Sequence, residues 1–261
     1  MYTLGLDFGS TASKGVILKD GHEVVETVTI HAGTGTSGPK RVKEELTKKS
    51  GLTDDDIKAT VVTGYGRTTY QGADKQISEL SCHAKGVNFL VSDAHTVIDI
   101  GGQDAKVLKL DKTGHLSNFV MNDKCAAGTG KFIEIMANRL GATFEELYDI
   151  AKKGNPLSIS SMCTVFAESE VISHIGAGEK REDIASGVIS SVAERVANLC
   201  KRHGVGNEVF LTGGLSGMPY FIEVLTKKLN RDIKTHVLSR YAGAIGAALT
   251  GLSKQKIILE P

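Results

Sequence analysis

Two of the four cysteines stand where thiolate chemistry is favoured. Cys125 lies directly before an amphipathic segment at 131–140, and Cys163 lies at the front of an expected helix over 164–176. Helix N-termini lower the pKa of a thiol and favour bound anions, so both residues suit metal-bound thiolates. A cubane iron–sulfur cluster takes four cysteines. Because only these two have matching surroundings, the pattern favours one cluster shared by two chains across a two-fold axis.

The alternative for both residues is a structural role, because most free cysteines are small buried side chains. Cys82 and Cys200 fall within expected helices at about 74–90 and 181–203, where packing is the favoured role. Further helices are expected at about 37–49, 125–140, 143–153 and 242–249.

A repeat supplies the second chemical feature. Residues 6–14 (LDFGSTASK) are echoed by residues 98–106 (IDIGGQDAK). In each copy an apolar strand runs into an Asp, a glycine turn follows, and a second and third strand continue the meander. Two meanders with the same loop chemistry indicate two similar half-domains.

Strand-end carboxylates beside glycine turns suit phosphates bridged by Mg²⁺. Asp7 and Asp99 are the expected metal-side carboxylates, acting through water. Gln103 or Asp104 could orient the attacking water, and the sequence leaves the choice between them open. The nucleotide-binding candidates are Asp7, Gly9, Ser10, Thr11, Ala12, Ser13 and Lys14 in the first turn, Asp99, Gly101, Gly102 and Gln103 in the second, and Gly213 and Gly214 in a third turn after the strand at 209–211.

Two common nucleotide motifs are missing from the sequence. Residues 128–131 (GTGK) lack the spacing of a P-loop, and the first strand is not followed by G-x-G-x-x-G. The turns instead resemble those of the actin, Hsp70 and sugar-kinase ATPase fold, an α/β fold in which two ribonuclease-H-like halves enclose ATP. We expect halves at 1–92 and 93–261, and a return of the last helix to the first half is the alternative at that end.

Longer motifs carry a more specific resemblance. Residues 122–130 (NDKCAAGTG) and 163–173 (CTVFAESEVIS) are similar to signatures of the activators of 2-hydroxyacyl-CoA dehydratases and the ATPase subunits of benzoyl-CoA reductases, the BadF/BadG/BcrA/BcrD-type ATPases. Residues 63–67 (TGYGR) and 74–83 (DKQISELSCH) match the same family.

The resemblance implies a homodimer with one [4Fe-4S] cluster, held by Cys125 and Cys163 of each chain. ATP hydrolysis to ADP would drive single electrons into a partner iron–sulfur dehydratase, reductase or double-cubane protein, with ferredoxin or flavodoxin as the upstream donor. It also implies that Gly128, Thr129, Gly130 and Arg240 belong to the cofactor-binding residues. Met162, where Thr is expected, and Arg240 with its neighbours depart from the dehydratase-activator pattern and leave the partner open.

The composition of the chain argues against some classes of function. The 261 residues are 41% hydrophobic with a formal charge of +1, so no overall field would recruit nucleic acid or an anionic membrane. No stretch resembles a membrane span or a signal segment, and the cysteines do not form a secreted disulfide framework. We therefore expect a cytoplasmic protein.

Two other functions remain possible at this stage. A small-molecule kinase of the same fold would need a substrate pocket, for which the chain has little inserted length. A scaffold ATPase with buried cysteines would contain no iron.

Several residues near the motifs are given structural roles. Glu168 and Glu170 are expected to complement a helix dipole. His83 is expected to be a core or surface residue. The loop at 64–67 contains two glycines, so ordering its backbone costs conformational entropy. Docking of a partner or sensing of the nucleotide is therefore a hypothesis for Arg67.

Overall fold

The computed structural model describes residues 1–206 and 208–256, with side chains described as far as residue 252. The chain forms two compact units. The first contains residues 1–95, 108–118 and 236–261, and the second contains residues 96–107 and 119–235. Compared with the expected halves, 1–92 and 93–261, residues 108–118 are grouped with the first unit, and so is the last helix, whose return was considered.

The first unit contains a five-stranded sheet in the order β3-β2-β1-β4-β5. β1 is antiparallel to β2 and parallel to β4. Its strands are β1 (Tyr2–Phe8), β2 (Ser13–Lys19), β3 (Glu23–Ile30), β4 (Ile57–Thr63) and β5 (Lys75–Gln76), and its helices are α1 (Gly38–Ser50), α2 (Glu79–Leu90) and α8 (Ala242–Lys256).

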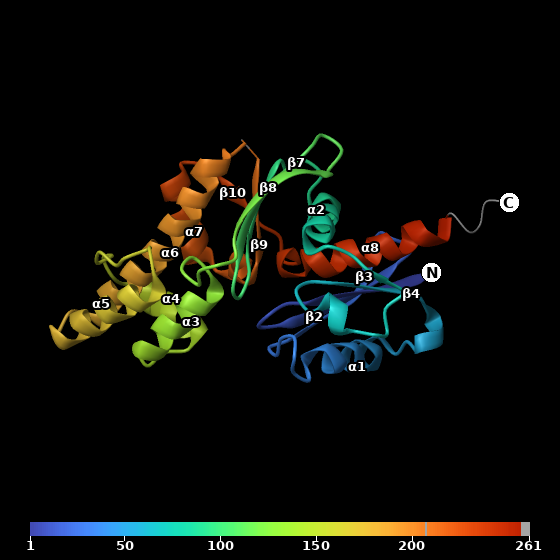
Figure 1. The fold of residues 1–261 in the computed structure, drawn as a ribbon, viewed down its shortest axis with the longest axis horizontal. Helices are drawn as coiled ribbons and strands as arrows, with labels where there is room; N and C mark the ends of the chain where they lie inside the picture. Colours follow the sequence, from blue (N-terminus) through green and yellow to red (C-terminus); the bar gives the residue numbers. More distant parts are fainter. Residues whose placement is uncertain (207, 257–261) are drawn as a thin grey trace. The chain divides into compact units, whose positions relative to one another are not determined.

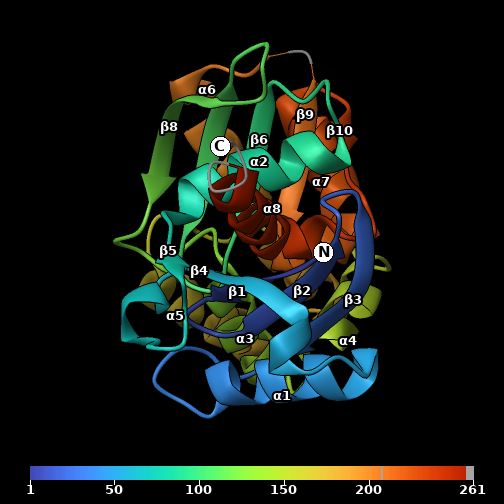
Figure 2. The same cartoon turned by 90° about the vertical axis from the view of Figure 1, so that its right-hand side faces the viewer.

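Helices cover both faces of this sheet, as Figure 2 shows. Leu6 and Phe8 belong to a core with Leu46 of α1, whereas Val16 and Leu18 pack with Ala244 and its neighbours on α8. A strand buried on both faces reads as a continuous apolar run, which is why β1 shows no alternation. Packing on both faces of the sheet therefore fixes the position of β1 and of the turn that follows Asp7.

The second unit is built on the sheet β10-β9-β6-β7-β8, with β9 parallel to both β6 and β10, although the parts of β7 and β8 within residues 108–118 are grouped with the first unit. Its strands are β6 (Thr96–Ile100), β7 (Ala105–Leu110), β8 (Leu116–Asn122), β9 (Val209–Gly213) and β10 (Ile233–Lys234), and its helices are α3 (Gly130–Arg139), α4 (Phe144–Ala151), α5 (Thr164–Gly176), α6 (Arg181–His203) and α7 (Pro219–Leu229).

These helices share one large core with the sheet and lie together beside it in Figure 1. The long helix α6 supplies the apolar stripe that its 3.6-residue pattern predicts, including Ile184, Val188, Val192 and Val196. The expected helices at 143–153, 164–176 and 181–203 are confirmed.

Two expected helices begin later than the sequence pattern indicated. The helix expected from residue 74 begins at Glu79, because Ser78 caps it by accepting a hydrogen bond from the Ser81 N–H, and β5 occupies part of the preceding segment. The helix expected from Cys125 begins at Gly130, and a turn precedes it.

Candidate functional site

The first candidate loop, in the first unit, follows β1. The antiparallel register places Asp7 opposite Lys14, and the Lys14 Nζ lies 3.4 Å from Asp7 Oδ2. Asp7 is 3% exposed, and the nearby lysine offsets part of the cost of burying its carboxylate. The Gly9 N–H donates to the Ala12 carbonyl at 3.0 Å and closes the turn between the strands.

The loop at 64–67 is fastened to the same strand end. The Gly66 N–H donates to the Phe8 carbonyl at 2.9 Å, and the Arg67 guanidinium donates to the Gly64 carbonyl at 3.0 Å. Gly64 has a φ of 88°, and a Cβ there would lie 2.5 Å from Asp7 Oδ1. Only glycine combines this backbone conformation with this closeness to a carboxylate. Tyr65 is 76% exposed at the tip.

The second candidate loop, in the second unit, has the same internal geometry. The Gly101 N–H donates to the Asp104 carbonyl at 2.9 Å, and the Lys106 Nζ lies 3.5 Å from Asp99 Oδ2. The parallel register places Asp99 beside Thr212, whose hydroxyl donates to Asp99 Oδ1 at 2.8 Å. These contacts repeat the Gly9 turn and the Asp7 pair of the first loop, as the duplication in the sequence indicates.

The two hydrolytic candidates differ in their surroundings. Gln103 is exposed, whereas Asp104 is half-buried with Oδ2 at 2.8 Å from the Lys106 Nζ. In the third turn Gly213 is buried at the end of β9 and Gly214 is exposed. Arg240 is half-buried in the short turn Ser239–Tyr241 of the first unit.

Asp7 and Asp99 meet the requirements for an indirect magnesium role. Mg²⁺ binds through one or two carboxylates together with waters and phosphate oxygens. Each aspartate is buried at a strand end with a lysine beside it, and each lysine could also contact phosphate.

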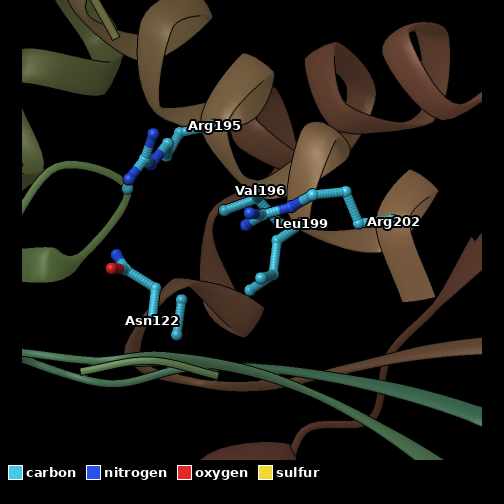
Figure 3. A pocket seen from close by; sticks show the side chains of 7 residues that line it. Asn122, Arg195, Val196, Leu199 and Arg202 are labelled. Carbon is cyan, nitrogen blue, oxygen red and sulfur yellow. The ribbon is translucent and has the colours of Figure 1, made fainter. Parts of the chain in front are cut away.

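The turn that carries Cys125 is held from two sides within the second unit. The Asn122 amide donates to the carbonyls of Cys125 and Ala127, at 2.9 and 3.0 Å. Gly128 has a φ of 86°, and its Cα faces the aliphatic stem of Arg195 so closely that a Cβ would lie 2.7 Å from Arg195 Cγ. Figure 3 shows Arg195 projecting from α6 toward this turn, with Asn122 across the depression.

The rest of the candidate segment is well ordered by local contacts. The Thr129 hydroxyl donates to the Ala126 carbonyl at 2.6 Å, and the Gly130 N–H donates to the Gly101 carbonyl at 3.0 Å. Residues 128–130 therefore connect the cysteine turn with the second phosphate-loop candidate. Because these contacts enclose the first residues before α3, the helix cannot extend back to Cys125.

Both cysteine segments meet beside Met162. The Cys125 thiol lies 3.8 Å from the Met162 carbonyl oxygen, and Cys163 is the next residue and the N-cap of α5. Both thiols are half-buried, whereas Cys82 and Cys200 are fully buried. Burial raises the pKa of Cys82 to about 11 and that of Cys200 to about 12. The structure therefore separates two accessible thiols from two core thiols.

The surroundings of the accessible pair fit an iron–sulfur cluster. The buried Thr164 hydroxyl, directly after Cys163, has no hydrogen-bond partner within the described part of the chain. Hydrogen-bond donors near cluster sulfurs are among the features that set cluster potential. One chain therefore offers two cysteines from neighbouring segments, which is half of the donor set of a cubane.

An exposed apolar face adjoins the cysteines. Met162 is 75% exposed, and Val165 and Phe166, on the first turn of α5, are each 66% exposed. Ile172 and Ile175 extend this face along the same helix. Large apolar side chains gathered in this way mark an interaction surface more often than a free surface.

Sequence reasoning missed four contacts around the cysteines. Asn122 and Arg195 hold the Cys125 turn, Glu168 pairs with Arg139, and the Glu170 carboxylate accepts from the Ser160 N–H at 2.6 Å. Only Asn122 had a local signal, because asparagine side chains often bond nearby backbone groups. The expectation that both glutamates simply complement the helix dipole is incomplete.

Together the two sheets and their paired Asp–Lys turns define an ATPase of the actin, Hsp70 and sugar-kinase fold. The similarity to a ROK family glucokinase from Streptomyces griseus supports this fold alone, with a TM-score of 0.59 at 12% identity over 95% of this chain and 98% of that one. The BadF/BadG/BcrA/BcrD ATPase family matches residues 4–251, and the chain belongs to this family.

Much closer similarities lie within the family. The chain is 54% identical to the 2-hydroxyisocaproyl-CoA dehydratase activator of Clostridioides difficile over 257 residues, which is 98% of this chain and 97% of that one. A solved structure of the activator of the 2-hydroxyisocaproyl-CoA dehydratase from Clostridium difficile, with bound ADPNP, has a TM-score of 0.95 at 53% identity, covering 100% of this chain and 99% of that one. The resemblance expected from the motifs is confirmed.

Within the part of the chain that the structure describes, no helix is long and apolar enough to cross a membrane.

Proposed function

We propose that this protein is a cytoplasmic, ATP-dependent single-electron donor that activates a partner iron–sulfur enzyme. The observation that carries the proposal is that the Cys125 thiol lies 3.8 Å from the carbonyl oxygen of Met162, the residue directly before Cys163, and that both cysteines are half-buried. We propose that two chains form a homodimer, in which Cys125 and Cys163 of each chain hold one [4Fe-4S] cluster. When bound, the cluster would supply a low-potential electron carrier, and Mg²⁺ would neutralise phosphate charge.

ATP binding is assigned to the two Asp–Lys turns. Lys14 and Lys106 offer positive charge beside Asp7 and Asp99, and the similar activator was solved with bound ADPNP. We propose that Gln103 orients the hydrolytic water, because Asp104 is already paired with Lys106. Coupling requires that nucleotide state biases the arrangement of the segments that carry Cys125 and Cys163.

The dimer and the partner are assigned to the exposed face of α5. Its apolar side chains lie next to the cysteines, where a second copy would complete the donor set. A 2-hydroxyacyl-CoA dehydratase is the proposed partner class, after the relative that is 54% identical, and a benzoyl-CoA reductase or double-cubane protein is the alternative within the family. The proposed upstream donor is ferredoxin or flavodoxin.

The decisive experiment is the iron and acid-labile sulfide content after anaerobic purification. We expect about four of each per dimer, lost in Cys125→Ala and in Cys163→Ala because each removes two of the four ligands. Cys82→Ala and Cys200→Ala are the matched controls and should keep the cluster, since both side chains are buried in cores. Absence of iron after iron-replete anaerobic production would contradict the proposal.

A further inference from the structure

Between α4 and α5, residues 154–162 form an extended segment, here called the strap, that belongs to no helix or sheet. Its beginning is held by Asp183, which accepts the Asn155 N–H at 2.7 Å through its carboxylate and the Leu157 N–H at 3.3 Å through its carbonyl. A polar cavity of about 160 Å³ lies between the strap and α6, lined by Ser158 and Ser161 among others. Packing beneath the strap is incomplete at this cavity, although Ile159 is buried in the core of the second unit and Leu157 packs against that core. Hydrogen bonds hold the strap at its two ends.

The other end of the strap is held by one side chain of α5. The Ser160 N–H donates to Glu170 Oε2 at 2.6 Å. The Met162 N–H then donates to the Ser160 hydroxyl at 3.3 Å, and the Met162 carbonyl lies 3.8 Å from the Cys125 thiol. A continuous series of contacts thus runs from Glu170 to Cys125 and passes the residue directly before Cys163.

Glu168, two residues earlier on the same helix, makes a different contact. It pairs with Arg139 at 2.5 Å, and the arginine side chain is 54% exposed. Exposed pairs of this kind contribute little to stability, whereas a carboxylate that accepts a backbone N–H forms a charge-assisted bond. The two acids of α5 therefore have the same charge and distinct tasks.

We propose that Glu170 is a positioning residue for the cysteine pair: by holding the strap at Ser160 it sets the spacing of Cys125 and Cys163. This inference rests on the proposed function only in treating the two thiols as cluster ligands. The carboxylate touches neither thiol, so it acts on the cluster site through the backbone. Loss of a hydrogen bond to a charged group lowers the population of the held geometry by about tenfold or more.

The first test uses metal-free protein and a short reagent that bridges two thiols. We expect Glu170→Ala to form the Cys125–Cys163 bridge within one chain about tenfold more slowly than the wild type. Glu170→Gln keeps an acceptor oxygen and should restore the rate, and Glu168→Ala, the matched charge change, should leave it unaltered. A folded Glu170→Ala protein that bridges at the wild-type rate would overturn the inference.

A second measurement needs no variant. In the wild type, hydrogen exchange at the Ser160 amide should be slowed relative to exposed loop amides, and exchange as fast as in an open loop would overturn the inference even if Glu170→Ala failed to fold.

In cluster-loaded protein, the reduction potential of the cluster should shift in Glu170→Ala and return to the wild-type value in Glu170→Gln. An unshifted potential in Glu170→Ala would also count against the inference. Thiol bridging and hydrogen exchange require no iron. A protein that contains no iron would therefore contradict the proposed function, while both measurements could still test the role of Glu170.

Discussion

At the scale of single residues, charge and burial distinguish the candidate functional side chains from those that only pack in the core. Asp7 and Asp99 are 3% and 2% exposed, and each has a lysine at its side. The lysine offsets part of the free-energy cost of burying each carboxylate. Burial raises the pKa of the Cys82 and Cys200 thiols, as expected for side chains that only pack.

The raised pKa of Cys200 predicts a pH dependence of stability. Below pH 9 the thiol is neutral in both the folded and unfolded states, so it contributes no pH dependence. Between pH 9 and about 12 the unfolded thiol ionises while the folded one stays protonated, which favours the unfolded state. The free energy of unfolding should therefore fall with rising pH, by about 1.4 kcal/mol per pH unit from this group.

Urea denaturation of the reduced protein across this range would measure the effect. Cys200→Ala should show a shallower alkaline decline than the wild type. Equal slopes in the wild type and Cys200→Ala would contradict the assignment of the decline to Cys200.

At the scale of elements, the duplicated meander explains why the two phosphate-loop candidates were visible in the sequence. An apolar strand, an Asp, a glycine turn and a lysine seven residues after the Asp are local features, and the antiparallel register of β1 and β2 places Lys14 opposite Asp7. The start of α3 was not visible, because Asn122 and Arg195 arrive from β8 and α6. The role of Glu170 was hidden for the same reason, since its partner is a backbone N–H of the strap.

The turn at 64–67 gives a prediction at this scale. Gly64→Ala places a methyl group against Asp7 Oδ1 and the Phe8 carbonyl, whereas Gly51, with a φ of 70°, has open space around its Cα. Both alanine variants should lose about 1 kcal/mol from the left-handed backbone. Gly64→Ala should lose roughly 1–3 kcal/mol more from crowding, together with weaker ATP binding.

Denaturant unfolding and nucleotide titration of the two variants would separate these contributions. A Gly64→Ala protein with the stability and ATP affinity of Gly51→Ala would show that the turn does not press on the Asp7 carboxylate.

At the scale of the whole molecule, the fold class and family followed from sequence, whereas the return of residues 108–118 to the first unit did not. Residues 108–118 and 236–261 return to the first unit over long chain separations. Local pattern identifies the small-residue helix α8, but its place depends on close approach to α2: Gly86 and Gly246 each face backbone of the opposite helix. Such contacts join residues far apart in sequence, which periodicity cannot reveal.

The α5 face predicts the behaviour of the assembly. Phe166→Asp introduces charge into the apolar surface beside the cysteines and should convert the proposed dimer to monomers, because an unpaired charge is costly to bury. Val237→Asp, at a residue of the first unit that is 87% exposed, is the control and should remain dimeric.

Sedimentation of both variants under anaerobic conditions would measure their oligomeric states and so test whether the α5 face forms the dimer interface. A Phe166→Asp protein that stays dimeric and keeps its iron would place the interface between copies elsewhere.

The late position of α8 in the chain also sets the order in which the two units can fold during synthesis on the ribosome. The second unit has all of its segments once residue 235 has emerged, whereas the first unit still lacks the helix that covers Val16 and Leu18 on one face of its sheet. Until α8 arrives, that apolar face stays open to water or to a chaperone. The N-terminal strands, although made first, thus reach their final packing only after α8 has been synthesised.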